Sequence, residues 1–66
     1  MKQTRQISVI EDKDNGIILI PLRGTKVARS KSIVDEGVQV LNDLGADIIL
    51  HFDHEGEITE IELMGF

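Results

Sequence analysis

The chain has 66 residues, enough for one domain but too few for a large core, because a domain of this size buries only roughly 60% of its unfolded surface. It contains no cysteine, which excludes disulfide bonds and thiolate zinc sites. Twelve acidic and seven basic residues give a net charge of −5, and the chain has two Phe but no Tyr or Trp. With so little means to neutralise phosphates or stack bases, we expect no nucleic-acid binding.

The charges are unevenly distributed along the chain. Residues 1–33 hold seven basic and three acidic groups, whereas residues 34–66 hold nine acidic groups and no basic one. Such asymmetry fits an acidic surface that binds a basic protein, two halves that pair across a dimer, or a surface that simply keeps the protein in solution. There is no signal-peptide core after Met1 and no membrane-length apolar run, so we expect a soluble cytoplasmic protein without membrane binding.

The first predicted element is a β-hairpin made of Ile7–Glu11 and Ile17–Leu22. The intervening residues end in Asn15-Gly16, a pair typical of hairpin turns. The second strand is apolar on both faces, with Ile17 and Leu19 on one side and Ile18, Ile20 and Leu22 on the other. A strand of this kind is usually covered on both faces, and a chain this short hardly supplies two layers. A second subunit is therefore the expected cover.

The middle of the chain predicts an edge strand followed by an ambiguous segment. Residues 27–32 alternate weakly, and their Lys and Arg suit a sheet edge, where charge discourages further pairing. The segment from Ile33 to Leu44 has an apolar stripe at helical spacing, and Gly45 stands where a helix commonly stops, which favours a short helix over residues 35–44. Because Gly37 and three valines disfavour a helix, a strand remains open as the alternative.

The closing predicted hairpin joins Asp47–Asp53 to Glu57–Leu63 through a turn that contains Asp53 and Gly56. Asp at the start of a turn can accept hydrogen bonds from the backbone ahead of it. The apolar phase slips between Ile58 and Ile61, which predicts a bulge after the turn, with Gly56 in the left-handed conformation as the bulge residue. The expected fold is thus one α+β domain over residues 1–66: a small antiparallel meander of four to five strands with one short helix packed on one face.

Two segments of the chain carry a resemblance to a known family. They are Val27-Ala28-Arg29-Ser30 and the closing stretch from Phe52 to Leu63, in which Asp53, Gly56 and Ile58 have the family's spacing. This pattern resembles the domain of unknown function 2283 family of small prokaryotic proteins, although the Tyr common in its opening hairpin is missing and Val38 to Asp47 resembles an insertion. The resemblance implies a small β-rich fold without an assigned activity or catalytic residue. Some members resemble the smaller partner of toxin–antitoxin-like pairs.

The candidate metal ligands are His51, Asp53 and His54. Imidazole and carboxylate together suit zinc or another transition ion, and alternation places His51 and Asp53 on one face of a strand. Solvated side chains on a half-exposed sheet and in a turn are the commoner explanation, so we expect no metal site and no cofactor.

No other pattern predicts chemistry. Asp12 to Gly16 lacks the spacing of a calcium loop, and Gly24-Thr25-Lys26 lacks the upstream glycine of a phosphate loop. Glu60 and Glu62 share a strand face that gives no reason for burial. We therefore expect no enzyme activity and no catalytic residue.

The sequence favours a non-enzymatic interaction module that forms a homo-oligomer, with a dimer as the first expectation. The candidate interface residues are aliphatic positions of the second strand and the chain's last residue: Ile18, Ile20, Leu22 and Phe66. The alternative function is an acidic, antitoxin-like protein that binds a small basic partner.

Overall fold

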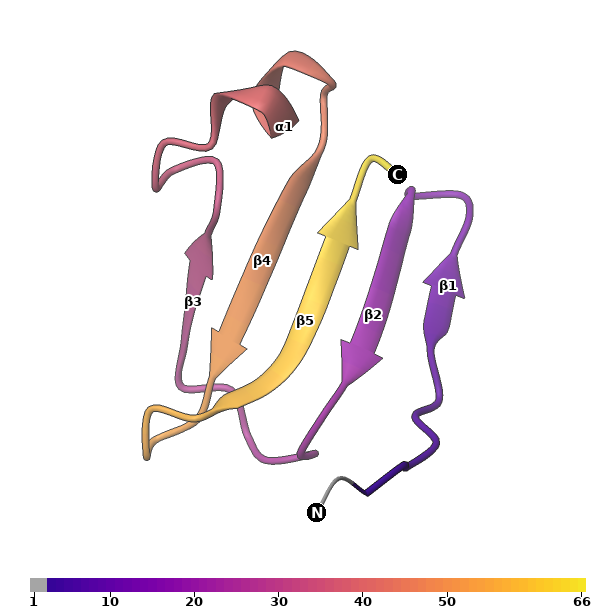
Figure 1. The fold of residues 1–66 in the computed structure, drawn as a ribbon, viewed down its shortest axis with the longest axis vertical. Helices are drawn as coiled ribbons and strands as arrows, with labels where there is room; N and C mark the ends of the chain where they lie inside the picture. The colour runs from indigo at the N-terminus through magenta and orange to yellow at the C-terminus, as the bar shows by residue number, and fades with distance from the viewer. Residues whose placement is uncertain (1–2) are drawn as a thin grey trace.

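A computed structural model describes residues 3–66 of the chain. It consists of one antiparallel sheet and one short helix (Figure 1). The elements in chain order are β1 (Ile10–Asp12), β2 (Ile17–Pro21), β3 (Arg29–Ser32), α1 (Gln39–Asp43), β4 (Asp47–Phe52) and β5 (Ile58–Met64). The prediction of a small antiparallel sheet with one short helix is confirmed.

The strand order is β1-β2-β5-β4-β3, so the predicted simple meander is wrong. After β2 the chain passes the lower ends of the strands to reach the far edge of the sheet, and β5 then returns between β2 and β4 (Figure 1). Followed from β5 back to β2, these four strands have the order of a Greek key, in which β5, β4 and β3 are neighbours in turn and β2 returns to lie beside β5. The physical reason is apolar pairing, because β5 sets Ile61 and Leu63 beside Ile20 and Ile18, whereas β3 would offer Lys and Ser.

The first hairpin forms where the sequence predicts it, with a shorter opening strand. Register pairs Asp12 with Ile17, and the turn between them is fastened by Asn15, whose backbone and side-chain nitrogens both donate to the Asp12 carboxylate. Pro21 is the last residue of β2, where a missing N–H costs the sheet least. All of β1 is exposed, since it is an edge strand with one neighbour.

The helix is shorter than the predicted residues 35–44. Gly37 adopts φ +100°, outside helical geometry, and the residues before it form turns in which the backbone N–H of Asp35 donates to Ser32 Oγ. Helix α1 ends at Asp43, and Gly45 stops it as predicted through a Schellman motif, in which the N–H groups of Gly45 and Ala46 donate to the carbonyl oxygens of Asn42 and Leu41. None of its residues is buried, and it lies beyond the end of the strands rather than on a face (Figure 1).

The closing hairpin confirms the turn and a bulge after it, but the bulge residue is Thr59 and not Gly56 as predicted. Asp53 Oδ1 accepts hydrogen bonds from the backbone N–H groups of Glu55 and Glu57, at 3.0 and 3.1 Å. The pairing of β4 with β5 slips between His51 and Phe52, which places one extra residue, Thr59, in β5.

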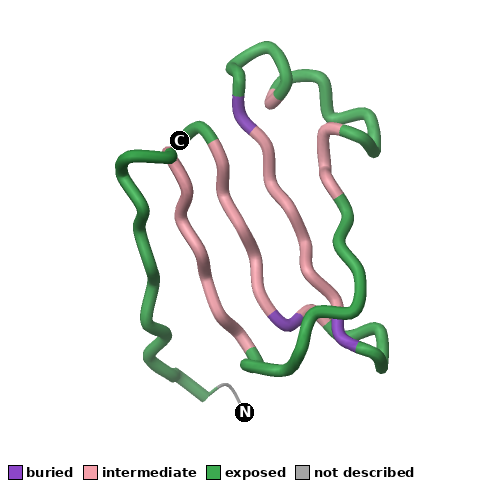
Figure 2. Tube along the Cα trace, turned by 180° about the vertical axis from the view of Figure 1, so that it is seen from behind, coloured by how far each residue is buried: buried purple, intermediate pink, exposed green. Residues whose placement is uncertain are grey.

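The sheet has little buried core of its own. Among residues 3–66, only Ala46, Asp53 and Thr59 are buried, while the aliphatic side chains of the central strands are half-buried (Figure 2). The sheet is a single layer, so side chains gain cover mainly from neighbours on the same face.

Candidate interaction surface

Register divides the sheet into two chemically different faces, because directly opposed residues in paired strands share a face. Ile18, Leu63 and Ile48 form one row across β2, β5 and β4, and Ile20, Ile61 and Leu50 form the next. We call the side that holds these rows the apolar face. Its central members are Ile18, Ile20, Leu22, Ile48, Leu50, Phe52, Ile58, Ile61 and Leu63.

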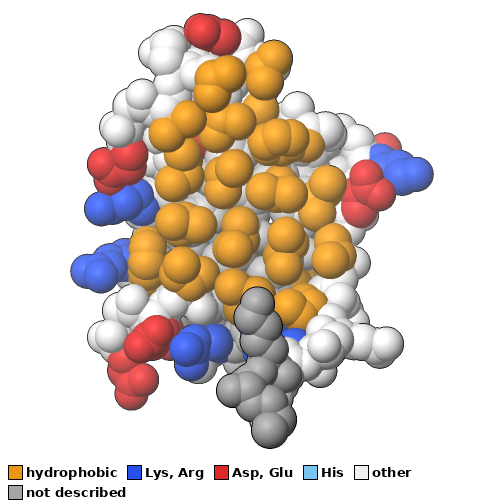
Figure 3. All heavy atoms as spheres, viewed as in Figure 1, with side chains coloured by type: hydrophobic (Ala, Val, Ile, Leu, Met, Phe, Trp, Pro, Cys, Tyr) orange, Lys and Arg blue, Asp and Glu red, His pale blue; other side chains and the backbone are white. Residues whose placement is uncertain are grey.

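The apolar face is open to solvent in the single chain. Figure 3 shows hydrophobic side chains running without interruption across the sheet and on toward the helical end. Soluble monomers rarely expose contiguous apolar patches of more than a few hundred Å². This surface is therefore the strongest candidate for an interaction site.

Two global measures agree with an uncovered layer. The accessible surface is 5194 Å², whereas a compact monomer of this mass would expose about 4,200 Å². The radius of gyration is 13.0 Å, against about 11 Å expected for a compact chain of this length. The excess surface, about 1,000 Å², is comparable with the roughly 800 Å² that each partner buries in a standard interface. The exposed segment before β1 contributes to this excess together with the sheet.

The opposite side, which we call the mixed face, combines aliphatic and polar groups. Register places carboxylates there from four residues: Asp12, Asp47, Glu60 and Glu62. His51 lies among them, with Nδ1 2.6 Å from Ser30 Oγ and Nε2 3.0 Å from Glu62 Oε1. This hydrogen-bonded chain spans β3, β4 and β5, and it satisfies both ring nitrogens of His51.

Asp47 is held on the same face by its own partners. The Ser32 hydroxyl donates to Asp47 Oδ2, and the backbone N–H groups of Val34 and Ile48 donate to Oδ1. These bonds, the one from Ser32 above all, lower the pKa of the Asp47 carboxyl against the opposing effect of desolvation. Asp47 therefore fastens the turn after β3 to the start of β4.

A second polar cluster secures the turn between β4 and β5. Besides the two turn amides, Asp53 accepts a hydrogen bond on Oδ2 from the Thr25 hydroxyl at 3.0 Å. Thr59, only 1% exposed, donates from Oγ1 to the Thr25 carbonyl at 2.8 Å. Its own carbonyl accepts from the backbone N–H groups of Leu22 and Arg23. The cluster thus binds the crossing connection to the closing hairpin, which is a structural role.

The structure separates the residues considered as metal ligands. His51 points onto the mixed face, Asp53 is engaged by the turn and Thr25, and His54 is exposed within the turn. Over residues 3–66, no three His, Asp or Glu side chains come together as a possible metal site. The hydrogen-bonded chain through Ser30 and Glu62 was missed from sequence, because it depends on pairing across three strands.

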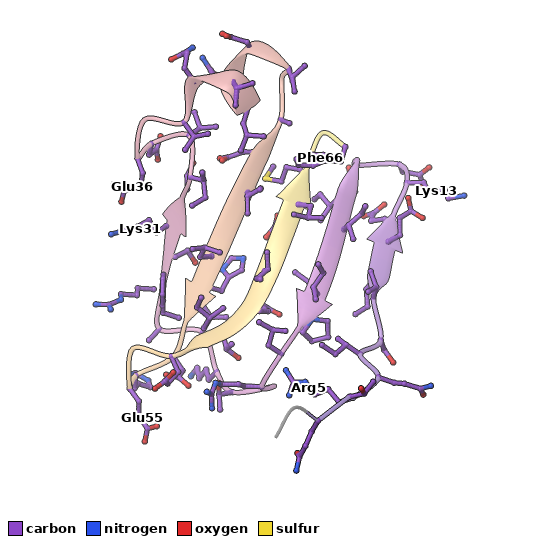
Figure 4. All side chains as sticks on the ribbon, viewed as in Figure 1. Arg5, Lys13, Lys31, Glu36, Glu55 and Phe66 are labelled. Atoms are coloured by element: carbon purple, nitrogen blue, oxygen red, sulfur yellow. The ribbon has the colours of Figure 1, made fainter. Side chains whose placement is uncertain are left out.

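The four predicted interface residues do not all lie on the apolar face. Ile18 and Ile20 lie in the centre of the apolar face, and Leu22 continues their alternation beyond β2. Phe66 is 60% exposed and lies past the end of β5, beside the turn between β1 and β2, so register assigns it no place in the face (Figure 4). The members from β4 and β5 could be recognised from alternation within each strand, but only register brings them beside Ile18 and Ile20.

Comparisons with known proteins supply no family for the chain. No protein-family model matches it, and neither a curated protein nor a solved structure does. In the part of the chain that the structure describes, no helix is long and apolar enough to cross a membrane.

Proposed function

We propose that this protein is a non-enzymatic interaction module that forms a homo-oligomer, first a dimer, through the apolar face of its sheet. The observation that carries the proposal is a continuous aliphatic face left open by a chain whose described residues bury only one apolar side chain, that of Ala46. Stacking two such faces would create the two-layer core that single sheets lack.

The excess surface of the single chain is large enough for this function. An interface of standard size removes about 800 Å² of surface from each partner, close to the excess surface of the single chain. Homodimer interfaces are also more apolar than other protein surfaces, with charge displaced to the rim. On the apolar face the charged residues of the strands, Glu11, Arg29 and Lys31, all lie in the two edge strands.

The first test is the solution mass by light scattering over a concentration series at low and high salt. We expect twice the chain mass of 7.4 kDa, retained on dilution and in salt, because apolar burial is not screened. A monomer at every concentration would overturn the proposal.

A matched pair of variants sharpens this test. Ile61→Thr changes the centre of the apolar face, whereas Ile49→Thr changes a half-buried position on the mixed face, opposite Ser32 and Glu62. Both variants keep a β-branched residue, so strand propensity is nearly equal. We expect dissociation at micromolar concentration only for Ile61→Thr, with circular dichroism reporting whether each variant stays folded. Equal behaviour of the two would contradict use of the apolar face.

A second function is supported by the charge of the mixed face, which points outward when the apolar face is covered. Its strands present four carboxylates, and by register none of their Lys or Arg residues lies on that side. We propose that this face binds a small basic protein, as the antitoxin-like alternative predicts. The resemblance to the domain of unknown function 2283 family, which stays a prediction, also favours such a partner.

Titration with an arginine- and lysine-rich peptide tests this second function. We expect binding that weakens in salt and weakens further in Glu60→Gln, while the turn variant Glu55→Gln, with the same charge change, has less effect. Binding that is equally weakened by both variants would indicate net charge alone and contradict a defined site.

A further inference from the structure

We infer that the two copies stack with their two-fold axis parallel to the strands, so that β3 of one copy lies over β1 of the other. This inference rests on the proposed dimerisation and adds the orientation of the partner. It is carried by the opposite charges at the two edges of the apolar face.

The basic edge belongs to β3. Register pairs Arg29 with Phe52 and Lys31 with Leu50, which places both cations on the apolar face. The Arg29 guanidinium lies over the Phe52 ring, 5.4 Å from its centroid. Lys31 Nζ is 3.0 Å from Glu36 Oε1 (Figure 4). The Lys31 side chain is 59% exposed and that of Glu36 is 50% exposed, so Lys31 can reach another carboxylate.

The acidic edge belongs to β1. Register pairs Glu11 with Ile18, so its carboxylate projects on the apolar face at the opposite side of the sheet. The two edge strands are four strand spacings apart, about 19 Å. Glu11 and Lys31 are therefore too distant to pair within one chain.

Only two aligned ways of stacking keep the faces together, and they differ in what the edges meet. An axis across the strands would set β1 over β1 and β3 over β3, which opposes like charges at both edges. An axis along the strands exchanges the edges, so that Glu11 of each copy meets the basic edge of its partner. The offset between Glu11 and Lys31 along the strands is two residues, about 7 Å, which these long side chains can span.

Charge reversal tests the orientation. We expect Glu11→Lys and Lys31→Glu each to raise the dimer dissociation constant about tenfold at low salt, since each turns two symmetric attractions into repulsions. Combining both substitutions restores the attraction and should return the constant to near the wild-type value. An axis across the strands predicts no such rescue, because like charges then face each other in every homodimer.

Matched controls separate orientation from net charge. Asp14→Lys lies in the turn after β1 and has the same charge change as Glu11→Lys. Lys26→Glu lies in the connection before β3 and has the same charge change as Lys31→Glu, and neither position belongs to a strand. We expect neither to move the dissociation constant by more than about twofold. If the control variants raised the dissociation constant as much as the edge variants, the inference would be overturned.

Cross-linking gives an independent readout, because the chain has no cysteine of its own. With a short bismaleimide, Glu11→Cys combined with Lys31→Cys should yield a closed covalent dimer, whereas Lys31→Cys alone should stay uncross-linked. A cross-linked dimer of Lys31→Cys alone would establish the axis across the strands and overturn the inference. A ladder of higher oligomers would indicate edge-to-edge pairing and overturn it as well. A wild-type monomer in light scattering is a separate result that removes the proposed function itself.

Discussion

The two hairpins of this protein begin from similar local sequences and reach different environments. Each turn opens with an Asp that accepts hydrogen bonds from the residues ahead, and each ends in a Gly with positive φ. Yet Asp12 is exposed, whereas Asp53 is only 8% exposed and also accepts from Thr25. The comparison shows that local chemistry makes a turn, while its place in the sheet decides how much other structure depends on it.

The largest effect is expected where the two hairpins meet. Gly65 donates its N–H to Gly16 of the first turn at 2.9 Å, and a Cβ at Gly65 would lie 2.5 Å from the Gly45 carbonyl oxygen. Gly65→Ala should therefore lower the free energy of unfolding by about 3 kcal/mol, through strain at φ +80° and a backbone clash. Urea unfolding at fixed protein concentration measures the change.

The control for this prediction is Gly24→Ala. Gly24 has a similar φ of +73°, but a Cβ there would meet nothing within 4 Å. Only the conformational cost remains, about 1 kcal/mol. Equal losses for the two variants would show that the close approach at Gly65 does not matter.

A middle-sized effect should distinguish the hydrogen bonds of the two hairpins. Thr59→Val keeps the side-chain shape but leaves the Thr25 carbonyl without its buried donor, so we expect a loss of about 1–2 kcal/mol. Asn15→Ala removes the exposed bond from Asn15 to Asp12 and should cost no more than about 0.5 kcal/mol. A cost for Asn15→Ala as large as that for Thr59→Val would remove the contrast between the hairpins.

The smallest expected effect is the dependence of the free energy of unfolding on acidic pH. Desolvation opposes ionisation of Asp53, but hydrogen bonds from Glu57, Thr25 and Glu55 and the nearby Arg23 charge outweigh it and lower the pKa below the ordinary 3.8. Because the pKa of Asp53 is lower in the folded state, its ionised carboxylate stabilises the protein at pH values above the ordinary pKa. This contribution is lost as the pH falls through the folded-state pKa.

Asp53→Asn isolates that contribution. At neutral pH we expect the variant to be less stable than wild type, and the difference should shrink as the pH falls below the pKa of Asp53. The pKa of Asp12 is also lowered, mainly by the hydrogen bond from the Asn15 side chain. Its contribution to stability should therefore depend on pH in the same direction, so Asp12→Asn serves as the exposed comparison. A stability gap for Asp53→Asn that is constant across the acid range would contradict the assignment.

Much of the local structure was predictable because its causes lie within a few residues. Both hairpins, the edge position of the strand with Arg29 and Lys31, the helix stop at Gly45 and the bulge after Gly56 follow from turn chemistry, charge and alternation. The helix was predicted too long, because Gly37 leaves helical geometry and Ser32 bonds to Asp47 across the turn. The bond from Ser32 to Asp47 joins residues distant in sequence, so a local pattern could not reveal it.

The sequence by itself determined which strands exist, which residues alternate within each strand and which half of the chain is acidic. Tertiary structure alone decided that β5 enters between β2 and β4, because strand pairing depends on matching side chains across long separations. That choice gathers the aliphatic rows into one face, links Ser30, His51 and Glu62 on the other, and sets Glu11 and Lys31 at opposite edges. Period-two alternation is a local property, but the identity of a strand's neighbour is not.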